Sequence, residues 1–249
     1  MVLRRRLLFY ETHDSANRFL ADIYAYRAAA ACENEDDLQA IRSVDSLIIN
    51  TLMCGVDKCG YVDQWKLFLT GKGNFRNDIA VTAPYKGNRA DKAKPKHLAA
   101  VRTHLMQEWK ADMSAGQEAD DSIAIEATKL GDDGVIVSLD KDLDQVAGWH
   151  YNFIKREAYY ITEAEGLLKF YMQILTGDTA DNIIGIRGIG NVKAKKMLEG
   201  AEDETEMFIR CVEAYDDNED RVVENAHLLF LRRHEGQTWT TPLNRTMSP

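Results

Sequence analysis

The sequence predicts an α/β fold with a central, mostly parallel sheet flanked by helices. Short apolar runs typical of buried strands recur up to about residue 160, and segments with helical spacing lie between them. From Glu163 onward the pattern is helical almost to the end. Alternating strands and helices indicate a parallel sheet, because parallel neighbours need a crossover connection.

Each element has its own signal. Apolar residues at helical spacing predict an amphipathic helix over 35–52, and an aromatic and aliphatic run predicts a strand over 64–70. The run G-V-I-V-S-L over 134–139, bounded by aspartates, is typical of a strand buried on both faces. Three further elements are expected: a helix over 119–130, a short helix from Leu143 and a strand over 149–154.

Composition narrows the class of protein. The 249 residues carry a formal net charge of −9 and are 45% hydrophobic, which is typical of a soluble globular chain. No apolar run approaches the roughly 20 residues of a membrane span, so we expect no membrane partner. Acidic residues from Glu11 end the short apolar stretch after Arg6, and the four cysteines form no C-x-x-C pair. We therefore expect no export signal, a cytoplasmic location and reduced thiols.

Three short segments hold a high density of acids. Two of them have i, i+3 pairs that share a helical face, and the third follows the buried strand, at the sheet edge where open α/β folds bind ligands. Their carboxylates are Glu118, Asp120, Asp121, Asp140, Asp142, Asp178 and Asp181.

Taken singly, most of these acids would be solvated caps or turns. Seven carboxylates directed at one place would repel one another, unless hard divalent cations lay among them. Two Mg²⁺ or Mn²⁺ ions about 4 Å apart would activate water and stabilise the oxygens of a phosphodiester. The joint occurrence of the three acidic segments therefore favours a two-metal hydrolytic site.

Two stretches are basic despite the acidic average. Over 72–96, basic residues alternate with Phe75 and Tyr85, which suits phosphate contacts and base stacking, although a solvated basic loop is an equal alternative. Over 182–198, glycines permit a tight turn whose N–H groups face a phosphate. The candidate DNA contacts are Arg76, Lys92, Lys94, Gly185, Arg187, Gly188, Gly190, Lys193, Lys195 and Lys196.

Four ordered motifs carry a resemblance to a known family. They are P-Y-K-G-N-R at 84–89, E-A-D-D at 118–121, S-L-D-K-D at 138–142, and G-D-T-A-D-N with G-I-R-G-I-G at 177–190. Together they resemble the 5′-nuclease family, which includes flap endonucleases, phage 5′ to 3′ exonucleases and the N-terminal nuclease of bacterial DNA polymerase I.

This resemblance implies two parts. Residues 1–160 would form the nuclease core, with a helical arch at about 72–100, and residues 161–249 would form a helical DNA-binding part with a helix-three-turn-helix at about 174–200. The glycine turn would hold the duplex backbone with the help of a potassium ion.

The resemblance also implies roles. Tyr85 would stack at the base of the arch, Lys86 and Arg89 would engage the scissile phosphate, and Arg27 would contact the 5′ end. Glu118, Asp120, Asp121 and Asp140 would hold the first metal, and Asp142, Asp178 and Asp181 the second.

The chain departs from the family pattern at the first two strand ends. Leu20 stands where members carry a metal-binding Asp, Asp22 matches a second acid seen in some members, and Thr70 stands where many have another acid. Residues 1–19 do not read as the expected first strand.

We therefore expect a monomeric, metal-dependent 5′-nuclease that removes 5′ flaps or RNA primers during replication, in a phage. The alternatives are a branched-DNA-binding protein with weak or lost nuclease activity, motivated by Leu20 and Thr70, and an RNA-directed nuclease of the PIN type.

Overall fold

The central feature of the computed structural model is a six-stranded sheet; the structure describes residues 16–20, 23–59, 62–89 and 93–245. The strand order is β3-β2-β1-β4-β5-β6, with neighbours parallel except for the antiparallel pair β5 and β6. The α/β class and the mostly parallel sheet are confirmed. The strands are β1 (Ala16–Leu20), β2 (Val62–Thr70), β3 (Asp112–Ser114), β4 (Gly134–Val137), β5 (Gly148–Asn152) and β6 (Glu157–Ile161).

The first strand corrects one expectation. Residues 1–19 were expected to lack it, but Ala16–Leu20 form β1, which lies between β2 and β4. Its last residue, Leu20, pairs with Leu67 on one side and Val137 on the other. The short segment A-N-R-F-L has no clear alternation, so its place in the sheet depends on its two neighbours.

Helices cover both faces of the sheet, because alternate strand residues point to opposite sides. Leu67, Leu69 and Val135 pack with α2 (Ile23–Ala31), α3 (Asp37–Cys59) and α5 (Leu98–Gln107). Phe68 and Ile136 point the other way and pack with α6 (Ala119–Leu130). The helix expected over 35–52 is thus confirmed but longer, and the helix over 119–130 is confirmed.

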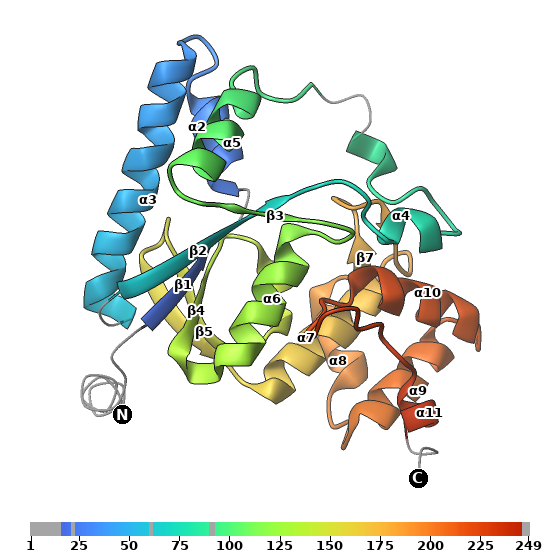
Figure 1. Cartoon of the computed structure of the whole chain (residues 1–249). Helices are drawn as coiled ribbons and strands as arrows, with labels where there is room; N and C mark the ends of the chain where they lie inside the picture. The colour runs from blue at the N-terminus through green and yellow to red at the C-terminus, as the bar shows by residue number, and fades with distance from the viewer. Residues whose placement is uncertain (1–15, 21–22, 60–61, 90–92, 246–249) are drawn as a thin grey trace.

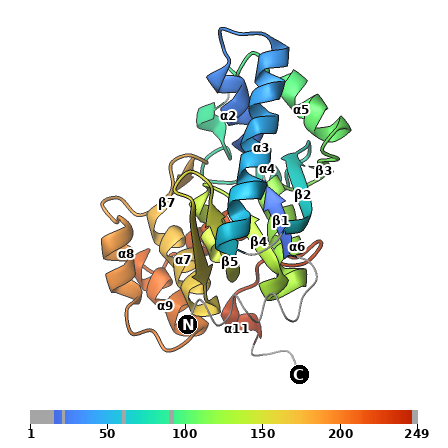
Figure 2. The same ribbon diagram turned by 90° about the vertical axis from the view of Figure 1, so that its left-hand side faces the viewer.

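The chain after the sheet is helical, as expected. Its helices are α7 (Glu163–Thr176), α8 (Asn191–Leu198), α9 (Glu204–Ala214), α10 (Glu219–Leu229) and α11 (Pro242–Arg245), with a short hairpin of β7 (Gly177–Asp178) and β8 (Ile183–Ile184). They share a second core that includes Phe170, Ile174 and Phe208. These helices lie on the opposite side of the sheet from α2, α3 and α5 (Figures 1 and 2).

The connections carry short helical turns. α4 (Arg76–Ile79) and the 3-10 turn η1 (Gly87–Arg89) follow β2, η2 (Gly131–Asp133) precedes β4, and η3 (Lys141–Gln145) follows it. The short helix expected from Leu143 is η3, which begins two residues earlier. Among the described residues, no helix is both long and apolar enough to cross a membrane.

A buried ion pair joins the sheet region to the helical part. Arg76 and Asp121 are 1% and 0% exposed, and two parallel hydrogen bonds of 2.6 and 3.0 Å link their side chains. Arg76 also donates from Nε to the carbonyl of Leu228 (2.8 Å) and from Nη2 to that of Phe230 (2.7 Å). The end of α10 is thereby fixed to α4 and α6.

Breaking this pair should destabilise the whole fold. Arg76→Met leaves the Asp121 carboxylate buried without its partner, so we expect a loss of about 3–5 kcal/mol in the free energy of unfolding. Urea denaturation measures it. The control is Lys66→Met, which removes the exposed ion pair of Lys66 with Glu126 and should cost less than about 1 kcal/mol. An equal effect of the two changes would contradict the role of Arg76.

Candidate active site

The carboxyl ends of five parallel strands meet at one edge of the sheet, and two of the three acidic motifs follow such strands, while Asp178 and Asp181 lie at the separate β7–β8 hairpin. Glu118 is the N-cap of α6, just after β3, and Asp120 lies in the first turn of that helix. Asp140 is the N-cap of η3, just after β4, and Asp142 lies within η3. The edge thus gathers acids from two separate connections, as the sequence predicts.

Two of the sequence motifs, residues 84–89 and 178–182, lie side by side although about 90 positions separate them. Lys86 donates its backbone N–H to the carbonyl of Asp181 (2.8 Å). Asn88 Nδ2 donates to the carbonyl of Thr179 (2.6 Å), and Asn182 Nδ2 donates to that of Pro84 (2.9 Å). This docking brings the basic side chains of one motif onto the acids of the other.

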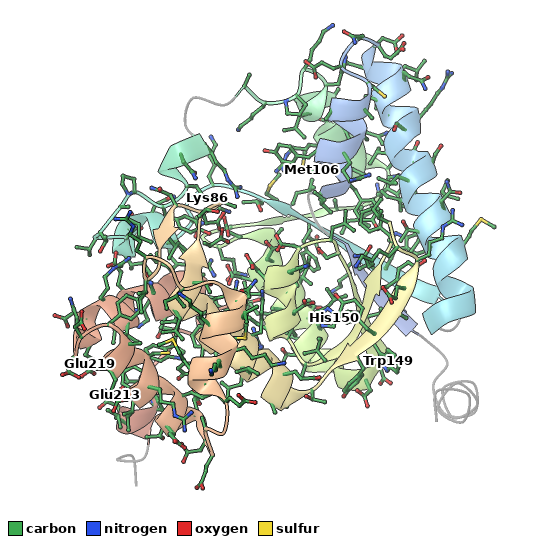
Figure 3. All side chains as sticks on the ribbon, turned by 180° about the vertical axis from the view of Figure 1, so that it is seen from behind. Lys86, Met106, Trp149, His150, Glu213 and Glu219 are labelled. Carbon is green, nitrogen blue, oxygen red and sulfur yellow. The ribbon has the colours of Figure 1, made fainter. Side chains whose placement is uncertain are left out.

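Lys86 is the cation at the centre of the cluster. Its ammonium forms an ion pair with Glu118 Oε1 and lies 3.5 Å from Asp181 Oδ2. Burial lowers the pKa of Lys86, but Glu118 and Asp181 outweigh it and raise the pKa above its ordinary value. In Figure 3, Lys86 lies beside the β7–β8 hairpin, where the helical part meets the sheet. Its backbone adopts a φ of 55°, which the contacts of 84–89 with 178–182 hold in place.

Tyr85 and Arg89, on the same motif as Lys86, also contact Glu118 or Asp181. The buried Tyr85 hydroxyl lies 2.9 Å from Glu118 Oε2 and 2.7 Å from Asp181 Oδ2, so it can donate to either. Burial, followed by the two negative charges, raises the pKa of Tyr85 and keeps it a neutral donor. Arg89 donates from Nη2 to Asp181 Oδ1 (2.7 Å) and from Nε to the carbonyl of Ala180 (2.8 Å).

The remaining acids repel one another. Burial and the charges of Asp140 and Glu118 raise the pKa of Asp120 well above its ordinary value. Burial and the charges of Asp140 and Asp178 raise the pKa of Asp142 to about 7. The pKa of Asp140 is raised as well, by partial burial and by Asp181 and Asp178. The raised pKa values of these three carboxyl groups indicate that negative charge is in excess in this part of the site.

This donor set fits hard divalent cations, which prefer carboxylate oxygens. As the side chains of the described residues are placed, however, no group of three His, Cys, Asp or Glu residues converges closely enough to enclose an ion. Lys86 supplies positive charge between Glu118 and Asp181 in this arrangement. Metal binding therefore requires Lys86 and the acids to adjust.

Two predicted site residues have another place in the structure. Asp121 was expected to bind metal, but its oxygens accept from Arg76, from the N–H of Glu118 (3.1 Å) and from the N–H of Arg232 (3.2 Å). Arg76 was expected to contact DNA, but it is buried and its guanidinium donates to protein groups. Neither residue is placed for its expected role in this structure, because each is the main partner of the other.

Other predicted residues lie at the periphery. Arg27 is exposed on α2, with its guanidinium carbon 6.0 Å from the Phe153 ring centroid, and Lys94 is exposed in the loop before α5. Asp178 accepts from the N–H groups of Ala180 (2.6 Å) and Asp181 (3.3 Å), which shapes the 178–182 turn. Asp22 and Lys92 lie outside the described residues.

The predicted glycine turn lies between β8 and α8. A side chain at Gly185 would collide with the backbone of Thr176 at 2.1 Å, and Gly188 has a φ of +83°. Around Gly188 and Gly190, by contrast, an added Cβ would meet no atom within 4 Å, so the backbone is open to a ligand on that side. The basic side chains of Arg187, Lys193, Lys195 and Lys196 are exposed around this turn.

The sequence interpretation missed two residues that shape the site. Glu224 on α10 accepts from the N–H groups of Val81 (2.8 Å) and Thr82 (2.7 Å) and so fixes the chain just before Tyr85. Gln173 on α7 donates to Asp142 Oδ1 (2.6 Å). Neither belongs to a recognisable motif, since a lone Glu or Gln within a helix carries no local signal.

Comparison with known proteins gives one match in sequence. The chain is 34% identical over 129 residues to thermostable DNA polymerase I of Thermus aquaticus. The match covers 46% of this chain, and it spans only 16% of the polymerase. No protein-family model matches the chain.

Solved structures share the fold over most of the chain. A bacteriophage T5 flap endonuclease in a pseudo-enzyme-product complex with DNA and metal ions has a TM-score of 0.64 at 17% identity, covering 86% of this chain and 89% of that one. A T5 5′-exonuclease with bound zinc ions has a TM-score of 0.61 at 18% identity, covering 86% and 89%. The catalytic core of Rad2 with a DNA substrate has a TM-score of 0.54 at 14% identity, covering 95% and 86%.

The raised pKa of Asp142 predicts how pH should affect metal binding. The folded protein favours the protonated Asp142 carboxyl, because the pKa of about 7 lies above the ordinary value of 3.8. This carboxyl therefore contributes to the stability of the metal-free protein at low pH, and the contribution is lost as the pH rises toward 7. A divalent cation competes with these protons, so the rise in Tm on adding Mg²⁺ should be larger at about pH 8 than at about pH 6.

Thermal unfolding in Mg²⁺ and in EDTA measures this rise in Tm. The matched control is Asp142→Asn, which cannot take up the proton and should flatten the difference between the two pH values. A rise in Tm that is the same at both pH values in the unmodified chain would contradict a coupled carboxylate site.

Proposed function

We propose that this chain, which resembles the 5′-nuclease family in fold and in part of its sequence, is a metal-dependent, structure-specific 5′-nuclease. It would hydrolyse DNA phosphodiesters and remove 5′ flaps or RNA primers in phage replication. The observation that carries the proposal is the cluster of Lys86, Tyr85 and Arg89 on the acids of the sheet edge. A basic group beside repelling carboxylates suits a phosphate bound through metal ions.

The residues that would hold two Mg²⁺ or Mn²⁺ ions are Glu118, Asp120, Asp140, Asp142, Asp178 and Asp181. When bound, the ions would supply an activated water and neutralise charge on the phosphate oxygens. Lys86 now pairs with Glu118 and lies near Asp181, two of the residues that would hold the ions. Lys86 and Arg89 would turn from these acids toward the scissile phosphate, while Tyr85 would hold the base of the arch.

The helical part, 161–249, would hold the duplex. In this proposal, 174–200 is the helix-three-turn-helix, and the open backbone at Gly188 and Gly190 lies against the phosphates, with a K⁺ ion at the turn. Residues 72–100 would form the arch over the site, and Arg27 and Lys94 would contact the strand that passes through it. Within this range, η1 and the start of α5 are helical, while α4 is fixed to α6 and α10 through Arg76.

Two observations favour a second candidate, a branched-DNA-binding protein with weak or lost nuclease activity. The central strand β1 ends at Leu20, which cannot bind a metal ion. At the end of β2, the Thr70 hydroxyl accepts from the N–H of Ala119 (3.1 Å) instead of offering a carboxylate. The edge therefore carries fewer acids than the family pattern implies.

Cleavage of a 5′-labelled flap substrate distinguishes the two candidates. Cutting near the junction with Mg²⁺ or Mn²⁺ but not with EDTA is expected for a nuclease, and Asp140→Asn should reduce the rate at least about a hundredfold. Equal rates for Asp140→Asn and the unmodified chain would contradict the site. Binding without cutting, with cutting gained by Leu20→Asp, would establish the second candidate.

The glycine turn predicts a strong dependence of DNA affinity on salt. If Lys195 and Lys196 contact backbone phosphates, Lys195→Gln with Lys196→Gln should lower the slope of log affinity against log salt by about 1 for each lysine. Fluorescence anisotropy on forked DNA gives the slope. Lys129→Gln on α6, whose lysine pairs with Glu126, is the control and should leave the slope unchanged. An unaltered slope in the double variant would place the duplex elsewhere.

A further inference from the structure

A chain of buried amides runs from the end of α10 to Asp142. Gln145 Nε2 donates to the carbonyl of Leu229 (2.9 Å), and Gln145 Oε1 accepts from the N–H of Leu231 (3.4 Å). Gln145 Nε2 also donates to Gln173 Oε1 (2.9 Å), and Gln173 Nε2 donates to Asp142 Oδ1 (2.6 Å). Gln145 and Gln173 are 5% and 6% exposed.

The chemistry of the partners forces the orientation of both amides. A backbone carbonyl can only accept and a backbone N–H can only donate, so Leu229 and Leu231 fix which end of Gln145 is nitrogen. Gln145 therefore donates to Gln173, whose oxygen must face it. The nitrogen of Gln173 is left facing a carboxylate, which accepts.

The consequence is a donor held on one oxygen of a candidate metal ligand. Burial prevents water from replacing Gln173, and a hydrogen bond to a charged acceptor is stronger than one between neutral groups. Groups that orient a ligand in this way commonly change metal affinity by 10–100-fold when removed.

We propose that Gln173 is a positioning residue for the metal site, and that Gln145 acts through it to set the direction of its N–H toward Asp142. The inference rests on the proposed function, because it assigns these two glutamines to the geometry of that same site. The ends of α10 and η3 then set the orientation of a metal ligand, although neither Leu229 nor Leu231 lies in an acidic motif.

The test measures Mn²⁺ binding by electron paramagnetic resonance in the whole chain without DNA. Gln173→Met keeps the size of the side chain and removes its donor, and it should weaken Mn²⁺ binding about tenfold or more. Gln145→Met should weaken it less, because Gln173 can still donate but is no longer held. The double variant should match Gln173→Met alone, since Gln145 acts through Gln173.

Asn225→Leu is the matched control. Asn225 is a buried amide on α10 that donates to the carbonyls of Ile174 (3.2 Å) on α7 and Ile184 (3.0 Å) on β8 and to the Tyr215 hydroxyl (2.8 Å), and none of these partners is a carboxylate. It should lower stability with little change in Mn²⁺ affinity, which separates positioning from loss of packing. If a glutamine variant fails to fold, the NMR signal of the Gln173 side-chain amide in the unmodified chain serves instead. This signal should shift on adding Mg²⁺, while the side-chain amide signal of Asn225 should not.

The outcomes separate this proposal from the proposed function. No Mn²⁺ binding by the unmodified chain would overturn the metal site and the positioning role together. Binding by the unmodified chain that is equal in Gln173→Met, or a Gln173 resonance that ignores Mg²⁺, would overturn the positioning role alone. Additive losses in the double variant would show that Gln145 acts by a separate route.

Discussion

Repulsion among carboxylates at the sheet edge is the constraint on which the rest of the site depends. Burial and the negative charges of neighbouring acids together raise the pKa values of Asp120, Asp140 and Asp142. An arrangement of this kind persists only if surrounding interactions hold it. The positive charge of Lys86 and the donors of Tyr85 and Gln173 are the parts of the protein that do so.

The end of α10 and the residues just after it form one of the structural links between the two halves of the chain. Within residues 228–232, backbone groups accept from Arg76, donate to Asp121 and contact both ends of the Gln145 amide. One short stretch therefore fixes the start of α6, which carries Glu118 and Asp120, and the turn that carries Asp142. Residues 228–232 therefore couple the packing of the helical part to the geometry of the acidic sheet edge.

The corrected residues show how local and tertiary information differ. E-A-D-D identified a helix start with acids, and the structure has that helix, but the acids differ in their neighbours. Asp121 accepts from Arg76, while Asp120 faces the negative charges of Asp140 and Glu118. Arg76 was predicted to contact DNA because it lies in the basic stretch 72–96, like the lysines that follow it. The helix C-terminus that accepts from Arg76 is about 150 residues away in sequence, so no local pattern could reveal it.

The sequence by itself determined the alternation of strands and helices, the mostly parallel sheet and which acidic motifs end at its edge, because spacing and strand periodicity are local properties. It also supplied the four motifs that resemble the 5′-nucleases. Only the tertiary structure decided that Ala16–Leu20 form the central strand, that residues 84–89 rest on 178–182, and that Gln145 and Gln173 point a donor at Asp142. The physical reason is that these contacts join positions far apart in the chain, whose partners are chosen by burial and by the need of every buried polar group for a hydrogen bond.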